Sequence, residues 1–430
     1  MSDSAQMAAR ARLFEAIEAR EDELIDLIAR LVQQPSVLGN EAGAQAVIAE
    51  YLRAGGQEPD IWEIPDSLLE RPGAGNSGVP FAGRPNVAAT LAGVGGGGKS
   101  LILNGHVDVV SPEPLANWHY DPWAAQIAGR RMYGRGAYDM KAGLAINMYL
   151  ARLVRELGIP LKADLTVQSV IEEECTGNGA LSACYRDDTR YHADAVIITE
   201  PSNGTYTAAH VGVLWFRVEV LGQAVHAAVA WKGVNAIYRM LPVIEELRAL
   251  DAEMNQESHP LFEGIEHPIN LNIGVIQGGD WPSSVAGACA IDCRLSMYPG
   301  RTVEETRARV LAAVERATER DGWLVEHPPT VTWYGFQSAG SEIAPEEPLV
   351  RALALHHERE RGTPLRPRSG TGTNDMRNFM VYSDMPALCY GVSGFGAHEA
   401  DEWLDLDSLV PTTKVLGAFL LDWCGVAAQG

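Results

Sequence analysis

The strand and helix signals of this chain follow two different orders, and the second order interrupts the first. Up to about residue 209, and again after about residue 336, apolar strand-like runs alternate with segments of helical periodicity, which is typical of an α/β domain with a sheet covered on both faces. Residues 210–335 instead follow the order βαββαβ, which predicts a ferredoxin-like unit with a core of its own. The sequence therefore predicts a discontinuous α/β domain, residues 1–209 and 336–430, with a smaller domain, residues 210–335, inserted into it.

The length of the chain agrees with two domains, because 430 residues exceed what one hydrophobic core usually holds. The predicted elements are best given as ranges. In the first part they are helices over 5–33, 40–54 and 141–157 and strands over 85–92, 100–109, 163–171 and 193–199. In the inserted part they are strands over 211–222, 269–279, 287–298 and near 323–334, with helices over 234–250 and 303–319. The last part returns to alternating helix and strand signals, with elements expected over 346–360, 375–381, 386–391 and 407–423.

The charge balance argues against a nucleic-acid partner. Lys and Arg number 34 against 56 Asp and Glu, a formal net charge of −22, whereas nucleic-acid binding needs clustered positive charge. The N-terminus has no apolar segment of the secretory type, and no run of 18 apolar residues indicates a membrane span. The six cysteines form no CxxC pair, so we expect reduced thiols in a cytoplasmic protein. Cys289 and Cys293 lie in a strand-like run and are expected to pack in a core.

One glycine-rich segment matches a nucleotide-binding pattern but is not expected to bind a nucleotide. GVGGGGKS, residues 93–100, matches the phosphate-loop pattern GxxxxGK[ST], but that loop must open a helix so that backbone N–H groups face the phosphates. Here the strand-like LILNGHVDVV follows instead. The run therefore predicts a glycine turn between two strands and no nucleotide site.

Acidic and histidine residues gather just beyond the ends of predicted strands. His106 and Asp108 end one strand, Glu172–Glu174 follow the next and Glu200 follows a third. Asp139 lies in the turn before the helix at 141–157, and His398 follows the short strand 386–391. Open α/β sheets place ligand sites at this edge. Because residues two apart share a face of a strand, the Asp108 carboxylate is expected to hold the second nitrogen of His106.

This inventory of two imidazoles and several carboxylates suits Zn²⁺ or a similar first-row metal, with enough oxygen ligands to bridge two ions. Such a pair lowers the pKa of a bridging water to about 7 and polarises a carbonyl, and an unligated carboxylate must then carry the proton. Each piece also has a structural interpretation: an HxD pair is common, three glutamates are usually a solvated face, and Asp139 could cap a helix. His119, His356 and His357 are interpreted as structural.

Taken together, the segments resemble the dizinc aminoacylase/carboxypeptidase family, which includes acetylornithine deacetylase, succinyl-diaminopimelate desuccinylase and glutamate carboxypeptidases. The resemblance covers nearly the whole chain, and the matching segments occur in the family's order. They are GHVDVV, YGRGAYDMKAG, IEEECTGNGA, TEPS, GQAVHAAVAWKGVNAI, GTGTNDMRNF and GAHEADEW.

The resemblance implies a role for each matching residue. Asp139 would bridge two metals, with His106 and Glu200 on one ion and Glu174 and His398 on the other. Glu173 would be the general base, and Asp108 would orient His106. The two ions would be zinc, with cobalt or manganese as alternatives.

The resemblance also implies a homodimer through the inserted domain, which would act as a lid and supply His226 across the dimer to the substrate's oxyanion. Arg294 and Arg377 match positions that often hold a substrate carboxylate, and Thr373, in the same matching loop as Arg377, is also expected to bind substrate. Two segments depart from the family. Pro282-Ser283-Ser284-Val285-Ala286 stands where Pro-Asn-x-Val-Pro is usual, and the usual proline after His226 is absent.

The predicted function is that of a metal-dependent amidohydrolase, a deacylase that removes a small acyl group from an N-acylated amino acid or amine by attack of a metal-bridged hydroxide. One alternative is a dipeptidase or carboxypeptidase of the same family. An alternative of another class is a non-catalytic binding protein that keeps the fold. The expected partners are a small N-acylated substrate and a second copy of the chain, with no nucleic acid and no membrane.

Overall fold

The main sheet of the computed structural model, which describes residues 2–188 and 190–428, has six strands. Their order is β1-β2-β6-β3-β7-β15, and β6, β3, β7 and β15 run parallel. Because they run parallel, the carboxyl ends of these four strands lie at the same edge of the sheet. The strands are β1 (Asp60–Glu63), β2 (Pro85–Leu91), β3 (Leu101–His106), β6 (Leu165–Val170), β7 (Ala195–Ile198) and β15 (Ala387–Cys389).

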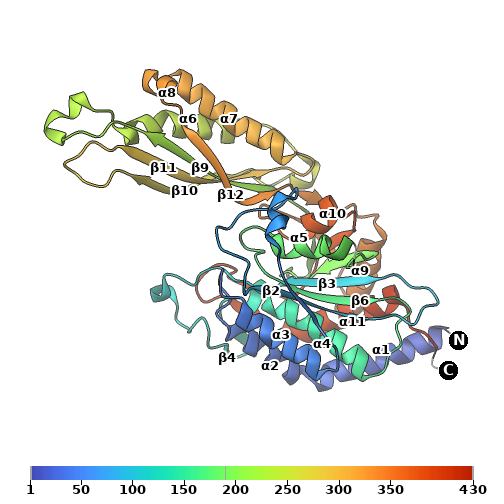
Figure 1. The fold of residues 1–430 in the computed structure, drawn as a ribbon. Helices are drawn as coiled ribbons and strands as arrows, with labels where there is room; N and C mark the ends of the chain where they lie inside the picture. The colour runs from blue at the N-terminus through green and yellow to red at the C-terminus, as the bar shows by residue number, and fades with distance from the viewer. Residues whose placement is uncertain (1, 189, 429–430) are drawn as a thin grey trace.

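Helices cover both faces of this sheet, as predicted. Figure 1 shows α2, α3 and α4 below the sheet, and α5 and α10 above it on the side of the inserted segment. All six residues of β3 are buried, as expected of a central strand of a sheet that is covered on both faces. The helices are α1 (Ser2–Ala19), α2 (Glu21–Val32), α3 (Ala42–Ala54), α4 (Ala142–Glu156), α5 (Asn178–Cys184), α9 (Pro348–Arg361), α10 (Met376–Tyr382) and α11 (Leu409–Cys424).

Gly143 lets the start of α4 touch the end of β7. A Cβ at this position would lie 1.9 Å from the main-chain oxygen of Thr199, a distance that no side chain tolerates. The last glycine of the motif YGRGAYDMKAG, Gly143, therefore lets the turn before α4 lie against the residues that follow β7. This close approach places Asp139 beside Glu200.

Two small sheets, whose strands were not predicted from the sequence, lie beside the main one. One has the order β13-β8-β14, with β8 (Thr205–His210) between β13 (Ser341–Glu342) and β14 (Arg366–Gly370). The other has the order β16-β17-β5-β4, from β16 (Gly394–Phe395), β17 (Trp403–Asp405), β5 (Arg131–Tyr133) and β4 (Gln126–Ala128). Most of these strands are two or three residues long, too short for a periodic pattern.

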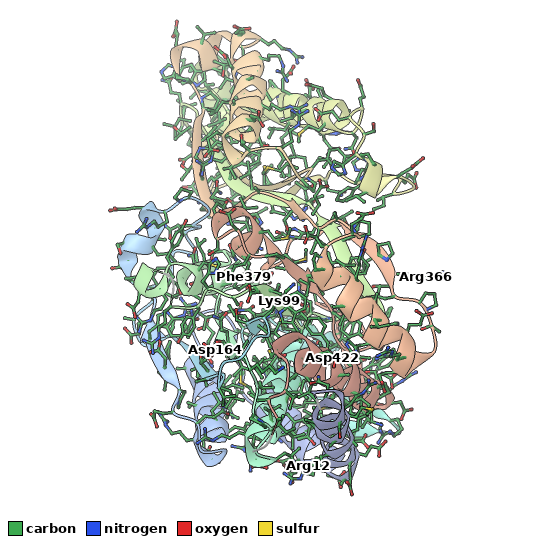
Figure 2. The ribbon with its side chains drawn as sticks, turned by 90° about the vertical axis from the view of Figure 1, so that its right-hand side faces the viewer. Arg12, Lys99, Asp164, Arg366, Phe379 and Asp422 are labelled. Carbon is green, nitrogen blue, oxygen red and sulfur yellow. The ribbon has the colours of Figure 1, made fainter. Side chains whose placement is uncertain are left out.

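The inserted segment forms a four-stranded antiparallel sheet of order β10-β11-β9-β12 with α6 and α7, the topology of the predicted ferredoxin-like unit. Its own hydrophobic core draws on residues from Ala209 to Phe336, and it projects from the main body in Figures 1 and 2. Arg12 of α1 lies at the opposite end of the molecule in Figure 2. The elements are β9 (Gly212–Leu221), α6 (Ala236–Met254), β10 (Leu271–Gly278), β11 (Ala288–Met297), α7 (Val303–Glu319), α8 (Gly322–Glu326) and β12 (Thr330–Ser338). The domain boundaries at 209/210 and 335/336 stay a prediction.

Two predicted elements were wrong in detail. The helix expected over 5–33 is two helices, because the backbone of Arg20 leaves the helical conformation between α1 and α2. The strand expected from 323 begins at Thr330, because Asp321 accepts hydrogen bonds from the N–H groups of Trp323 and Leu324 and thereby starts α8.

The remaining expectations about local structure are confirmed. The glycine run joins β2 to the strand β3, and Gly95–Gly98 all have positive φ, so no helix follows the phosphate-loop pattern. All six cysteines are free thiols, and Cys289 and Cys293 lie buried in β11. Within the described residues, no helix is both long and apolar enough to cross a membrane.

Candidate metal centre

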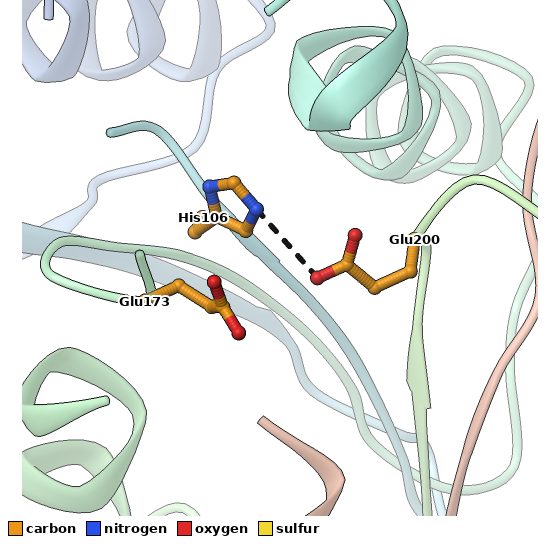
Figure 3. Close-up of side chains that lie close together, drawn as sticks. All are labelled: His106, Glu173 and Glu200. Carbon is orange, nitrogen blue, oxygen red and sulfur yellow. Dashed lines mark ion pairs between the residues drawn. The ribbon is translucent and has the colours of Figure 1, made fainter. Parts of the chain in front are cut away.

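The predicted residues at the strand ends come together in one cluster. His106 is the last residue of β3, and its Nε2 lies 3.4 Å from Oδ1 of Asp139 and 3.6 Å from Oε1 of Glu200. Figure 3 shows Glu200 facing this nitrogen from the chain after β7, with the carboxylate of Glu173 pointing toward the same space. The three side chains that the resemblance assigns to one ion, those of His106, Asp139 and Glu200, therefore lie close together.

A second imidazole approaches the same aspartate from the other side. Nε2 of His398 lies 3.0 Å from Oε2 of Glu174 and 3.7 Å from Oδ2 of Asp139. The two oxygens of Asp139 thus face different histidines, which is the arrangement of a carboxylate that bridges two ions. The hydrogen bond to Glu174 raises the pKa of His398 to about 9.

The donors fit divalent cations. His106 forms two overlapping groups of potential ligands, one with Glu173 and Glu200 and one with Asp139 and Glu174, each within 4.8 Å. Among the described residues, none of these four carboxylates forms an ion pair with a lysine or arginine, and the ion pairs that Asp139, Glu174 and Glu200 do form are with the imidazoles of His106 and His398. Two imidazoles with clustered carboxylates suit zinc or a similar metal.

Glu173 has the environment of a proton carrier. Its side chain is 5% exposed, and its Oε1 is buried without a hydrogen-bond partner. Burial raises the pKa of this carboxyl well above its usual range. A carboxylate without protein partners and with a raised pKa is a stronger base than an exposed one, so it can accept a proton from water and donate it again.

Asp108 acts through different atoms from those predicted. Nδ1 of His106 is 2.9 Å from the main-chain oxygen of Asp108, whereas the nearest carboxylate oxygen is 3.8 Å away. The carboxylate instead accepts the backbone N–H groups of Glu173 at 3.1 Å and Glu174 at 3.0 Å. The main chain of Asp108 thus orients His106, and its side chain fixes the turn that carries Glu173 and Glu174.

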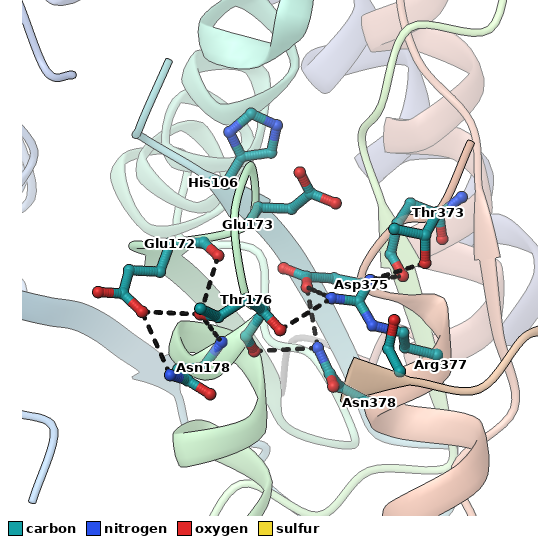
Figure 4. Close-up of polar contacts among 12 residues, drawn as sticks. His106, Glu172, Glu173, Thr176, Asn178, Thr373, Asp375, Arg377 and Asn378 are labelled. Atoms are coloured by element: carbon teal, nitrogen blue, oxygen red, sulfur yellow. Dashed lines mark hydrogen bonds and ion pairs between the residues drawn. The ribbon is translucent and has the colours of Figure 1, made fainter. Parts of the chain in front are cut away.

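The three consecutive glutamates have three different environments. Glu172 is fully buried at a φ of 63° and points away from the cluster (Figure 4). Its carboxylate accepts hydrogen bonds from four side chains and so anchors the turn beneath the other two glutamates. The donors are Ser77 Oγ at 3.0 Å, Arg84 Nη1 at 2.7 Å, Thr176 Oγ1 at 2.7 Å and Asn178 Nδ2 at 3.2 Å.

Glu402, a residue that was not predicted from the sequence, holds the turn of Asp139. Its carboxylate is fully buried and accepts the backbone N–H groups of Gly136, Tyr138 and Asp139, together with Nη1 of Arg135. The only signal for it was an acidic residue four positions after His398 in GAHEADEW, a segment that otherwise reads as a solvated loop.

A cleft of about 500 Å³ opens onto the cluster. Thr373 lines it, together with Tyr138, Thr207 and Arg368. Arg294 reaches toward the same loop from β11 of the inserted segment, and its Nη2 donates to the main-chain oxygen of Thr371, another lining residue, at 3.2 Å. No carboxylate of the described residues pairs with Arg294 or Arg368.

Arg377 does not take the position expected of a substrate anchor. It is fully buried and is absent from the residues that line the cleft. Its guanidinium donates to the main-chain oxygen of Thr176 at 3.3 Å and to Thr373 Oγ1 at 3.2 Å, and it lies 3.9 Å from Asp375 (Figure 4). Arg377 therefore ties the loop at 373–375 to the turn at 176.

Replacement of Arg377 by Ala is expected to lower the free energy of unfolding by at least about 3 kcal/mol, because it leaves the buried carboxylate of Asp375 without its nearest cation. Urea unfolding of metal-free protein measures this. Arg366→Ala, at an exposed position of β14, is the matched control and should change stability by less than about 0.5 kcal/mol. A stable Arg377→Ala protein with only a raised KM would restore the predicted role in substrate binding.

His226 lies away from the cluster. It is exposed in the inserted segment, its Nδ1 accepts the N–H of Ala228 at 3.0 Å, and it is not among the residues that line the cleft. The other three histidines have structural contacts, as interpreted. His119 pairs with Asp401, His356 with Asp422 and His357 with the hydroxyl of Tyr390.

Comparison with known proteins agrees with this geometry. The model of peptidase family M20/M25/M40 matches residues 102–422. N-formyl-4-amino-5-aminomethyl-2-methylpyrimidine deformylase of Bacillus subtilis is 30% identical over 95% of this chain and 96% of its own length. The chain belongs to this peptidase family. Acetylornithine deacetylase of Pectobacterium carotovorum, 28% identical over 80% of this chain and 86% of its own length, is a further relative.

Solved structures show the same fold. A dipeptidase from Saccharomyces cerevisiae has a TM-score of 0.77 at 16% identity, with 99% of each chain covered. A dinuclear metal-binding peptidase of the M20 family from Bacillus subtilis has a TM-score of 0.61 at 14% identity, covering 94% of this chain and 98% of its own. The predicted family, fold class and hydrolase function on linear amides are therefore confirmed, and binding of two metals is supported as a property of the M20 family.

Proposed function

We propose that this protein removes a formyl or other small acyl group from a primary amine, with two zinc ions held by the cluster. The observation that carries the proposal is the geometry of Asp139 between two imidazoles, with the unpartnered Oε1 of Glu173 beside them. His106, Asp139 and Glu200 would hold one ion, and Asp139, Glu174 and His398 the other. When bound, such ions supply Lewis acidity and lower the pKa of water.

The residues of the chain then perform the proton transfers. Glu173 accepts a proton from the attacking water and later donates it to the nitrogen of the leaving amine, which departs as a neutral amine. Asp108 holds the backbone of Glu173 in place through its N–H group. The buried Glu172 fixes the same turn from below, so the carboxylate of Glu173 does not drift during the reaction.

A formylated aminomethyl pyrimidine is the first substrate to test. The relative named for that reaction matches this chain over nearly the full length of both proteins, whereas the deacetylase relative matches over a shorter span. Apart from the cluster itself, the residues that line the cleft are mostly polar, among them Tyr138, Thr207, Arg368, Ser369, Thr373 and Asn374, which suits a polar substrate. Ser283 replaces the asparagine usual in the resembling family, which argues against an amino-acid-like leaving group.

The test is amine release from a matched panel: the N-formyl and N-acetyl forms of the aminomethyl pyrimidine, N-acetylornithine and dipeptides. Each is assayed with and without a chelator. We expect turnover of the N-formyl compound that the chelator abolishes and zinc restores, with cobalt and manganese compared as replacements. Preferential turnover of N-acetylornithine would move the substrate class to amino acids. Inactivity on every compound in protein that holds two metals would overturn the proposal.

We propose further that a second copy of this chain pairs with the inserted segment. Strand β10 is an edge strand bonded only to β11, and edge strands left unpaired invite a partner. Val275 and Ile276 on this strand are exposed, as are Tyr238 and Leu241 on α6 and Trp281 after β10. We propose a cytoplasmic location, since all six cysteines are free thiols.

His226→Ala is expected to keep both metals and the dimer but to lose most of kcat, because this donor would stabilise the substrate's oxyanion in the partner subunit. An experiment with mixed dimers tests whether His226 acts on the site of the partner subunit. Dimers assembled from His226→Ala and Glu173→Gln chains contain one site with both intact residues, so a fully exchanged equal mixture should recover about a quarter of wild-type activity. Mixed dimers that form but stay inactive would rule out action across the dimer.

A further inference from the structure

We infer that Glu402 is a positioning residue that sets the spacing between Asp139 and His398 and thereby controls occupancy of the second metal position. The inference rests on the proposed two-metal centre. It concerns residues of this chain that none of the resembling motifs assigned a role.

The carboxylate of Glu402 accepts hydrogen bonds from the turn that contains Asp139. One carboxylate oxygen accepts the N–H groups of Tyr138 and Asp139, both at 2.9 Å. The other accepts the N–H of Gly136 at 3.0 Å and Nη1 of Arg135 at 2.5 Å. Four donors thus converge on one buried carboxylate, three of them from the main chain, so the backbone of Asp139 itself is held in place.

The same residue ends the loop that carries His398. Glu402 is four residues after His398, and the main-chain oxygen of Glu402 accepts the N–H of Gly134 at 3.0 Å. Both the main chain and the side chain of Glu402 therefore form hydrogen bonds with residues 134–139. Because the loop cannot shift along this segment without breaking these bonds, Glu402 fixes His398 relative to Asp139.

Asp401 holds the opposite side of the loop. Its Oδ1 accepts the N–H groups of His119 at 2.8 Å and Tyr120 at 3.2 Å, and its Oδ2 lies 2.6 Å from Nδ1 of His119. Two neighbouring carboxylates thus attach the His398 loop to two different segments. His106 and Glu200, in contrast, lie at the ends of β3 and β7 in the main sheet and do not depend on this loop.

The two metal positions are therefore expected to respond differently to a change at Glu402. Loss of the Glu402 carboxylate removes the contacts that hold Asp139 and His398 in place. His398 belongs to the second metal position, and Asp139 is shared by both positions. The first position still has His106 and Glu200, which the main sheet holds. Residues that orient metal ligands typically contribute 10- to 100-fold in metal affinity. We expect Glu402→Gln to weaken the second metal by about this factor and the first by much less.

The experiment measures metal binding without substrate. Metal-free wild-type, Glu402→Gln and Glu399→Gln proteins are titrated with cobalt, and its absorption spectrum and metal content after dialysis are recorded. Glu399 is exposed in the same loop and carries the same charge, so its variant should bind like the wild type. The expected result is about two metals per chain in both of these proteins and about one in Glu402→Gln at limiting metal, with an about 10- to 100-fold weaker second step.

Other results would overturn the inference. Equal weakening of both steps in Glu402→Gln would indicate a general structural role, and two unchanged steps would remove the role altogether. If Glu402→Gln does not fold, as judged by near-ultraviolet circular dichroism, Asp401→Asn takes its place and should weaken the second step alone. A wild-type protein that binds no cobalt would refute the two-metal centre rather than the role of Glu402.

Discussion

Glu173→Gln is expected to lower kcat by about 10²- to 10⁴-fold while both metals remain bound. The amide keeps the volume of the side chain but can neither accept a proton from water nor return one to the leaving amine. Oε1 of Glu173 has no partner in the protein, so no hydrogen bond to that atom is lost on substitution. Steady-state kinetics and metal analysis on the same preparation measure the two effects.

Glu174→Gln is the matched comparison, because it changes the neighbouring residue of the same turn in the same way. It should lose metal from the second position, since Glu174 contacts His398 at 3.0 Å. The two variants therefore separate a proton carrier from a ligand. Loss of metal from Glu173→Gln would instead make Glu173 a ligand, a role that its position near His106 and Glu200 allows.

Asp139→Asn is expected to have the second large effect, with loss of metal from both positions and a fall in kcat/KM of about 10³-fold or more. Each oxygen of Asp139 faces a different histidine, so an amide, which offers one oxygen, cannot serve both ions. Equilibrium dialysis and activity at saturating zinc measure the outcome. Asp121→Asn, at an exposed position in an earlier loop, should retain both metals.

An intermediate result is informative as well. If Asp139→Asn keeps one tightly bound metal and measurable turnover, then one ion suffices and the bridge serves affinity only. Full occupancy and full activity would show that Asp139 does not bridge.

The clustering of the candidate ligands was predictable because their positions follow from a simple rule of topology. His106, Glu174 and Glu200 end or follow parallel strands, and the carboxyl ends of such strands meet at one edge of the sheet. Strand-like runs are visible in the sequence, so the residues that follow them can be grouped by their order in the chain alone. The same rule carries no information about which atoms of a residue make contact.

The failures share a physical cause, because each depends on contacts with segments far away in the chain. The roles of Asp108 and Glu402 depend on bonds to backbone N–H groups, which every residue except proline carries and which no sequence pattern marks. Arg377 matched a motif, but its burial depends on the packing of α10 against α5, segments far apart in the chain. Short strands such as β16 and β17 exist only because they pair with each other and with β5.

The position of the inserted segment has a consequence for synthesis on the ribosome. Strand β7 ends at Ile198, but its partner β15 begins only at Ala387, and α11, which packs on α1, comes later still. All strands and helices of the inserted core, by contrast, have been synthesised once β12 has been translated. We therefore expect the middle of this polypeptide to reach its native state first. The first half of the chain keeps an unpaired sheet edge until the last hundred or so residues have been synthesised, and we expect it to depend on chaperones during that time.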